Sequence, residues 1–118
     1  MGIDVYLRWE GQTKAEKDAQ YTGYSVVHGH IGYLREAYHG EPYATSILIP
    51  EGDQGGEITI PAATLRDRLP AALRACEERY RDEPTLIPQV KESFTQFVEL
   101  AERKEQETGT PIRVYVSG

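Results

Sequence analysis

The sequence is poor in several residue types: among 118 residues it has one cysteine, one tryptophan, one methionine and two phenylalanines. One cysteine cannot form an internal disulfide, so no disulfide framework holds this fold. No apolar run approaches the roughly 18 residues that a transmembrane helix needs. The start of the chain, Met1-Gly2-Ile3-Asp4, lacks the basic head and apolar stretch of a secretory signal. We therefore expect a soluble, cytoplasmic protein without a membrane partner.

Positive charge is also scarce, because 13 Lys and Arg stand against 19 Asp and Glu, a formal net charge of -6. A net anion is repelled by phosphate backbones, so nucleic acid is not an expected partner. The hydrophobic share of 39% and the charged share of 27% are ordinary for a globular protein. A chain of this length can bury one core unaided. The sequence therefore predicts a single domain over residues 1–118, and we expect no cofactor.

Two segments at the ends of the chain alternate apolar and polar residues, as half-buried strands do. They cover residues 3–9 and 112–117. The apolar face of the first is made of Ile3, Val5, Leu7 and Trp9, and its polar face of Asp4, Tyr6 and Arg8. In the second, Ile112, Val114 and Val116 alternate with Arg113, Tyr115 and Ser117. These two strands are expected to pair or to lie close, because the termini of a domain often meet.

Two further short apolar runs, Ser46–Ile49 and Glu57–Ile60, flank a turn-rich segment at residues 50–56. We interpret them as the strands of a hairpin with a long acidic loop. Its glycines resemble those of a phosphate-binding loop, but the lysine of that motif is missing. Acidic side chains in and beside the loop would also repel phosphate, so the hairpin interpretation is preferred.

A long helix is predicted after Pro61, a residue that suits the first turn of a helix. Apolar residues recur at steps of three and four from Leu65 to Tyr80. Cys76 belongs to this stripe, so we interpret it as a buried small hydrophobe and not as a nucleophile. Pro70 also falls inside the stripe, so the helix either kinks there or is divided in two.

A second long helix is predicted from Pro88 to about Thr108, with Gly109 as the residue that stops it. Its buried face is expected to comprise Val90, Phe94, Phe97, Val98 and Ala101.

Shorter elements are predicted in the first half. Thr13 and Glu16 have the spacing of a capping box and would start one or two exposed helical turns. Residues 22–29 are expected to form a strand or an extended loop. Residues 31–39 are expected to form a helix that ends at Gly40.

The order of these elements predicts an α+β fold. We expect a small mixed or antiparallel sheet of three to five strands. The two longer helices are expected to pack antiparallel on one face of it, in a two-layer sandwich.

Aromatic and titratable residues concentrate between residues 21 and 43, which hold all three histidines and five of the eight tyrosines. Flat amphipathic rings and titratable groups are what a polar ligand pocket uses, although the same tyrosines would suit the margin of a core. Arg8 and Trp9 would line the same region if the end of the first strand lies nearby. The candidate ligand-binding residues are Tyr24, His28, His30, Tyr33, Arg35, Glu36, Tyr38 and His39.

A metal site is one interpretation of this segment. His28 and His30 project to the same side of an extended chain, and a third ligand could come from His39, Glu36 or Glu41. Such a set suits a zinc ion with an open position. The segment lacks the helical H-E-x-x-H spacing of zinc hydrolases, so we assign no metal ligand.

We favour a non-enzymatic binding module that uses residues 24–43 to hold a small polar ligand or a protein partner, because no catalytic motif accompanies the cluster. The alternative is a small metal-dependent or histidine-based hydrolase. A homodimer is also expected, since a second subunit can cover the edges of a small sheet and two-fold dimers are the commonest oligomers.

Overall fold

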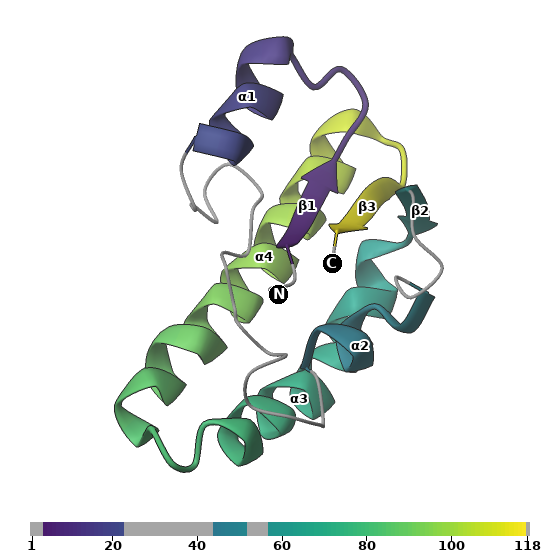
Figure 1. The fold of residues 1–118 in the computed structure, drawn as a ribbon. Coiled ribbons are helices and arrows are strands. Elements are labelled where there is room, and N and C mark those ends of the chain that lie inside the picture. The colour runs from purple at the N-terminus through teal and green to yellow at the C-terminus, as the bar shows by residue number, and fades with distance from the viewer. Residues whose placement is uncertain (1–3, 23–43, 52–56, 118) are drawn as a thin grey trace.

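The computed structural model describes residues 4–22, 44–51 and 57–117 of the chain. The elements predicted over residues 22–29 and 31–39 therefore lie outside the described residues, with the exception of residue 22. In chain order, the described elements are β1 (Asp4–Arg8), α1 (Lys14–Thr22), α2 (Ala44–Leu48), β2 (Glu57–Ile60), α3 (Ala62–Arg79), the short 3-10 helix η4 (Pro84–Leu86), α4 (Ile87–Thr108) and β3 (Ile112–Ser117) (Figure 1).

The three described strands form one antiparallel sheet in the order β1-β3-β2. β1 and β3 pair from Asp4 opposite Ser117 to Arg8 opposite Arg113. The predicted pairing of the first and last strands is thereby confirmed, and Figure 1 shows β1 beside β3. β2 lies on the other side of β3, which is therefore the central strand.

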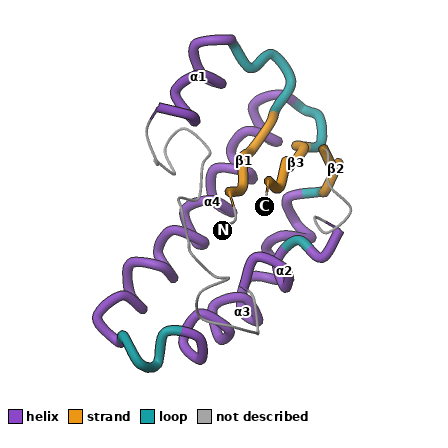
Figure 2. The backbone as a smooth tube through the Cα atoms, in the orientation of Figure 1, coloured by secondary structure: helices purple, strands orange, loops and turns teal. Residues whose placement is uncertain are grey.

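The apolar faces of the strands pack against α3 and α4, which run antiparallel to each other (Figures 1 and 2). Leu7 of β1, Leu65 of α3 and Phe94 of α4 are completely buried in the resulting core. Full burial of such a side chain stabilises the fold by about 1.5–3 kcal/mol. The sheet covers only one end of the helix pair, and the turn between α3 and α4 extends beyond it (Figure 2). The predicted two-layer α+β arrangement is confirmed.

The helix after Pro61 is continuous over Ala62–Arg79, with Pro70 in its interior. The alternative of two separate helices is therefore excluded. Pro70 is exposed, so the carbonyl that it leaves without an intrahelical partner can be hydrated. Cys76 is fully buried, as predicted for a core position.

The end of α4 also agrees with the prediction. Gly109 adopts a left-handed conformation with φ 70°, and its N–H donates to the carbonyl of Glu105 at 2.9 Å. Residues with a side chain rarely adopt this φ, which explains why a glycine stops the helix. Phe94, Phe97 and other members of the predicted face are buried, while Val90 is only partly so.

The predicted strand over Ser46–Ile49 is wrong, because this segment belongs mainly to the helix α2. The predicted hairpin therefore does not form, and β2 pairs with β3 instead. A short apolar run contains too few residues for its periodicity to separate strand from helix. Packing decides here, since α2 contacts α3, and Leu48 and the following Ile49 are buried in the core.

The capping box at the start of α1 is confirmed. The N–H of Glu16 donates to Thr13 Oγ1 at 3.1 Å, and the N–H of Thr13 donates to Glu16 Oε1 at 3.0 Å. The hydrogen bond from the Thr13 backbone lowers the pKa of Glu16. The helix differs from the prediction in its length and in its burial, because it extends to Thr22 and Gln20 is only 1% exposed.

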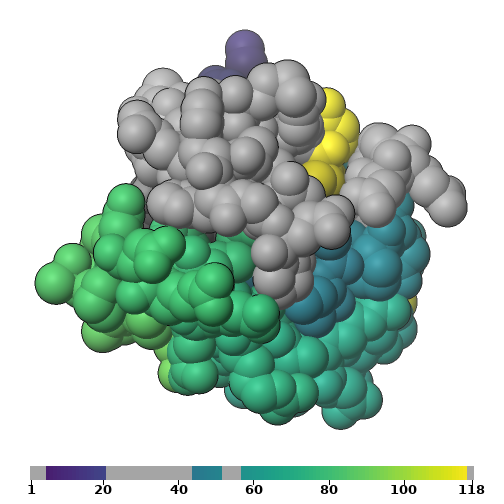
Figure 3. Space-filling view, turned by 60° about the horizontal axis from the view of Figure 1, so that its bottom comes forward, coloured from purple at the N-terminus to yellow at the C-terminus, as the bar shows by residue number. Residues whose placement is uncertain are grey.

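The helices α2, α3 and α4 lie side by side in the space-filling view of Figure 3. This agrees with the contacts between α2 and α3 and between α3 and α4. In the three described segments, no helix has both the length and the apolar character needed to cross a bilayer.

Candidate functional site

The candidate residues predicted from the sequence all lie within residues 23–43, outside the described residues. The structure thus gives no position for Tyr24, His28, His30, Tyr33, Arg35, Glu36, Tyr38 or His39. Their role as a binding segment stays a prediction.

Arg8 and Trp9, which the sequence associated with the same region, are both described. Trp9 belongs to the core cluster, and the ammonium of Lys104 lies 4.9 Å from the centre of its ring. Trp9 therefore packs in the core. The expectation that it lines the ligand region stays a prediction, because that region lies outside the described residues. Arg8 lies on the opposite side of the sheet, which leads to a second candidate site.

The face of the sheet turned away from α3 and α4 carries polar and aromatic residues. Alternation along each strand assigns to it Tyr6, Arg8, Glu57, Thr59, Arg113 and Tyr115, which we call the polar sheet face. Strand pairing orders these residues in two rows across the sheet. The first row is Tyr6, Tyr115 and Glu57, and the second is Arg8, Arg113 and Thr59.

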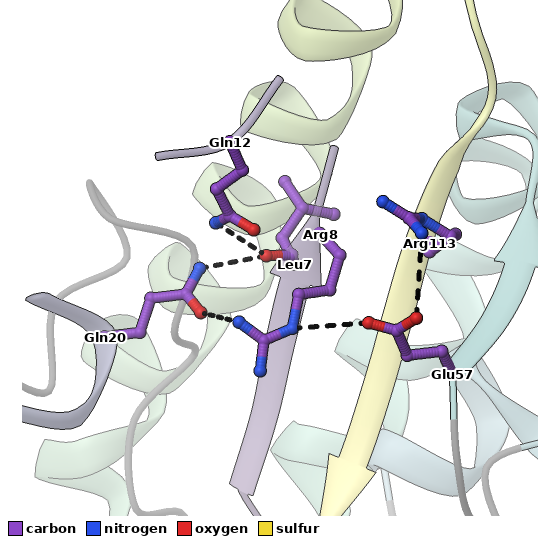
Figure 4. Close-up of polar contacts among 6 residues, drawn as sticks. All are labelled: Leu7, Arg8, Gln12, Gln20, Glu57 and Arg113. Carbon is purple, nitrogen blue, oxygen red and sulfur yellow. Dashed lines mark hydrogen bonds and ion pairs between the residues drawn. The ribbon is translucent and has the colours of Figure 1, made fainter. Parts of the chain in front are cut away.

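Arg8 is the most unusual member of the polar sheet face, because only 8% of this charged residue is exposed. Its Nη1 donates to Gln20 Oε1 at 3.1 Å (Figure 4). Gln20 in turn donates from Nε2 to the carbonyl of Leu7 at 2.9 Å, and Gln12 reaches the same carbonyl at 3.4 Å. The amide of Gln20 thus links α1 to β1 and holds the guanidinium in one orientation.

Glu57 lies between two guanidiniums (Figure 4). Its Oε1 is 3.6 Å from Arg8 Nε, and its Oε2 is 3.7 Å from Arg113 Nη1. Both distances exceed those of ordinary hydrogen bonds, so these contacts are loose ion pairs. The side chains of Glu57 and Arg113 are 45% and 42% exposed, which makes this end of the site accessible to solvent.

Two tyrosines complete the polar sheet face. The rings of Tyr6 and Tyr115 are stacked, with their centres 6.1 Å apart and an angle of 28° between their planes. The guanidinium carbon of Arg8 lies 5.7 Å from the centre of the Tyr6 ring, within range of a cation–π interaction. Since Tyr6 and Arg8 are both buried, the prediction of a strand with one exposed face is wrong for β1.

A second concave region lies where the start of α3 meets the end of α4. It is a hollow of about 560 Å³ lined by Glu102 and Glu105, among others. Both carboxylates have partners within the fold, because Glu102 accepts from Arg66 and Glu105 accepts from the N–H of Ala62 at 2.9 Å. Hydrogen bonding by Arg66 also lowers the pKa of Glu102. The two carboxylates that line this hollow therefore link α4 to α3.

The side chains of the polar sheet face are of the kinds that recognise polar ligands. It combines guanidiniums, a carboxylate, phenol rings and a threonine hydroxyl, which bind polar groups by charge, hydrogen bonding and stacking. Within the described part of the chain, no group of three or more His, Cys, Asp or Glu is placed to hold a metal ion. Cys76 is buried in the core and so is not positioned to act as a nucleophile.

Comparison of the chain with protein-family models, with curated proteins and with solved structures gives no match.

Sequence reasoning missed the polar sheet face, although part of the signal was present. Alternation put Tyr6 and Arg8 on one face of the first strand, and Arg113 and Tyr115 on one face of the last. Because these strands were expected to lie close, the four side chains could have been grouped. Glu57 could not have been added, since its strand was assigned to the wrong partner.

Proposed function

We propose that this chain is a non-enzymatic binding module for a small polar ligand, formed by the polar sheet face together with the segment 24–43. The observation that carries the proposal is the buried, oriented guanidinium of Arg8 beside Arg113, Glu57 and two tyrosines. A charged side chain is expensive to bury, so a guanidinium held in one orientation is a frequent feature of binding sites.

The aromatic and polar character of this face favours a small ligand. Pockets for small molecules combine a few oriented polar groups with flat rings that stack or pack against the ligand. Tyr and Arg are also enriched in protein interfaces, so a protein partner is the competing occupant of the same surface. The segment 24–43 supplies further residues of the same two kinds.

A thermal-shift screen of the untagged, chelator-stripped full chain tests the proposal. The panel contains small metabolites of each charge class together with Zn²⁺, Mn²⁺ and Ni²⁺. A ligand that binds only the folded state raises the melting temperature by mass action. We expect a rise with a metabolite that is reduced in Arg113→Gln and in His28→Ala, while the circular dichroism of both variants stays that of the wild type.

Two results would contradict this function. A rise specific to one metal, lost in the His28→Ala, His30→Ala double variant and accompanied by hydrolytic turnover, would support the hydrolase instead. A flat response over the whole panel would argue against a small ligand and favour the protein partner.

A further inference from the structure

The two outer strands of the described sheet differ in how their edges are covered. β1 forms one edge, where the carbonyl of Leu7 accepts hydrogen bonds from the side chains of Gln20 and Gln12 (Figure 4). Such contacts occupy a backbone group with which another strand would otherwise pair. β2 forms the other edge, which we call the β2 edge, and it consists of Glu57–Ile60.

Strand pairing decides which backbone groups β2 turns outward. In an antiparallel sheet the N–H and C=O of one residue point to the same side, and this side alternates along the strand. The Leu7 carbonyl points to α1, so the backbone groups of its partner Val114 point to β2. Val114 is opposite Ile58, which therefore bonds to β3, while the backbone groups of Glu57 and Thr59 point to the β2 edge. In the described segments, no hydrogen bond from outside the sheet reaches these outward groups.

We propose that the β2 edge pairs with the β2 edge of a second copy of this chain, antiparallel and about a two-fold axis at Ile58. This register places Glu57 opposite Thr59 of the second copy, and each such pair exchanges two backbone hydrogen bonds. All of the outward groups of β2 are then used. A shift by two residues in one direction would oppose the two Glu57 carboxylates, which repel each other. The same shift in the other direction would bring in Pro61, which has no N–H to donate.

The side chains on both faces are complementary in this register. On the polar sheet face, Thr59 lies between Arg113 of its own copy and Glu57 of the second copy, so unlike charges flank a neutral residue. On the helix side, Ile58 is partly buried against the core and would meet Ile58 of the second copy in a close cross-strand pair. Removing the rest of its surface from water favours association. One short strand buries less than a standard interface, so the dimer should be weak. This inference goes beyond the proposed ligand binding and does not depend on it.

Sedimentation equilibrium of the full chain, from micromolar to millimolar concentration, measures the dimer. Thr59→Glu puts a carboxylate opposite Glu57 of the second copy, and Thr59→Lys puts an ammonium there. Since symmetry makes two such pairs, the dissociation constant should rise about two- to thirty-fold in Thr59→Glu and fall by a similar factor in Thr59→Lys.

Folding of the single copy should respond with the opposite sign, because residue 59 is opposite Arg113 within its own sheet. At low concentration the melting temperature should rise in Thr59→Glu and fall in Thr59→Lys. This inversion separates dimerisation from stability. The matched controls are Thr85→Glu and Thr85→Lys, at an exposed position of η4 in the turn that extends beyond the sheet. They should leave the dissociation constant unchanged.

Oxidative cross-linking tests the register. The two copies of residue 58 would face each other within reach of a disulfide, so Ile58→Cys should form a covalent dimer. Thr59→Cys should not, because its two copies would be displaced by two residues along the strands. The native Cys76 is fully buried and should not compete.

A dimer that responds to the charge at residue 59 as described, and that cross-links through Ile58→Cys, supports the inference. It is overturned by a chain that stays monomeric at millimolar concentration, or by a dimer whose dissociation constant is the same in both Thr59 variants. Cross-linking through Thr59→Cys alone would also overturn it, because the strands would then pair in another register. If Ile58→Cys does not fold, the Thr59 charge variants decide.

Discussion

The substitution Gln20→Ala is the sharpest test of how the polar sheet face is held together. The side chain of Gln20 is 1% exposed and bridges α1 to β1 through the guanidinium of Arg8 and the carbonyl of Leu7. Alanine removes both hydrogen bonds and part of the buried aliphatic chain. The effect on stability can be estimated from these three losses.

The hydrogen bond to the charged guanidinium contributes about 1.5–2 kcal/mol, because bonds to charged groups are the stronger kind. The bond to the Leu7 carbonyl contributes about 0.5 kcal/mol, since Gln12 also donates to that oxygen. One buried methylene adds about 0.8 kcal/mol. The sum is a loss of about 3 kcal/mol, which for a domain of this size lowers the melting temperature by about 12 °C.

Urea denaturation followed by circular dichroism measures the free energy of unfolding, and a thermal scan gives the melting temperature. Gln20→Met keeps most of the side-chain volume and loses only the polar contacts, so it should lose about 2 kcal/mol. Gln96→Ala, at an exposed position of α4, is the matched control and should change stability by less than about 0.5 kcal/mol. A Gln20→Met variant as stable as the wild type would refute the importance of these hydrogen bonds.

Three further predictions concern the helix pair and the core. Glu105→Ala removes the carboxylate that accepts the first free N–H of α3, so the free energy of unfolding measured in urea should fall by about 1 kcal/mol. Hydrogen bonds from arginines hold the pKa values of Glu51 and Glu102 below the ordinary 4.5. A lowered pKa in the folded state stabilises the fold above about pH 4.5, and this contribution is lost as the pH falls through the folded-state value. The urea midpoint should therefore drop below about pH 4.5, by a modest amount because solvent screens both groups, whose side chains are 41% and 40% exposed. The thiol of Cys76 is fully buried, so Ellman's reagent should react with it only when the chain unfolds.

Each of these predictions has a control. Glu107→Ala, in the exposed last turn of α4, should leave the urea midpoint nearly unchanged and so separates the effect of the cap from that of removing any acid. The acid-induced drop should be smaller in the Glu51→Gln, Glu102→Gln double variant, and an equal drop would show that other groups cause it. Immediate, stoichiometric labelling of the native protein would place the Cys76 thiol at the surface.

Local patterns were enough to predict several elements of the fold. The alternation at the two ends of the chain predicted β1 and β3. In a strand with one apolar face every second residue is apolar, and a few residues are enough to show this pattern. The capping box at Thr13 and the stop at Gly109 were equally readable, since both depend on residues within one turn of a helix. The terminal strands were also correctly expected to lie together.

The helix α2 and the pairing of β2 were not predictable in the same way. Both segments are short apolar runs whose state depends on the surface they meet. The run at residues 46–49 packs on α3 as part of a helix, although its composition suits a strand. The start of α3 likewise receives its cap from Glu105, 43 residues further along the chain.

The sequence by itself determined the α+β class, the two long helices and the terminal strands, because periodicity and helix stops act over a few residues. Only the tertiary structure decided the candidate site on the sheet. Arg8, Glu57 and Arg113 come from three strands far apart in the chain, and they meet because β3 pairs with β1 on one side and β2 on the other. The burial of Arg8 also needs α1 to bring Gln20 to it. Such contacts depend on which surfaces pack together, and no local pattern encodes that choice.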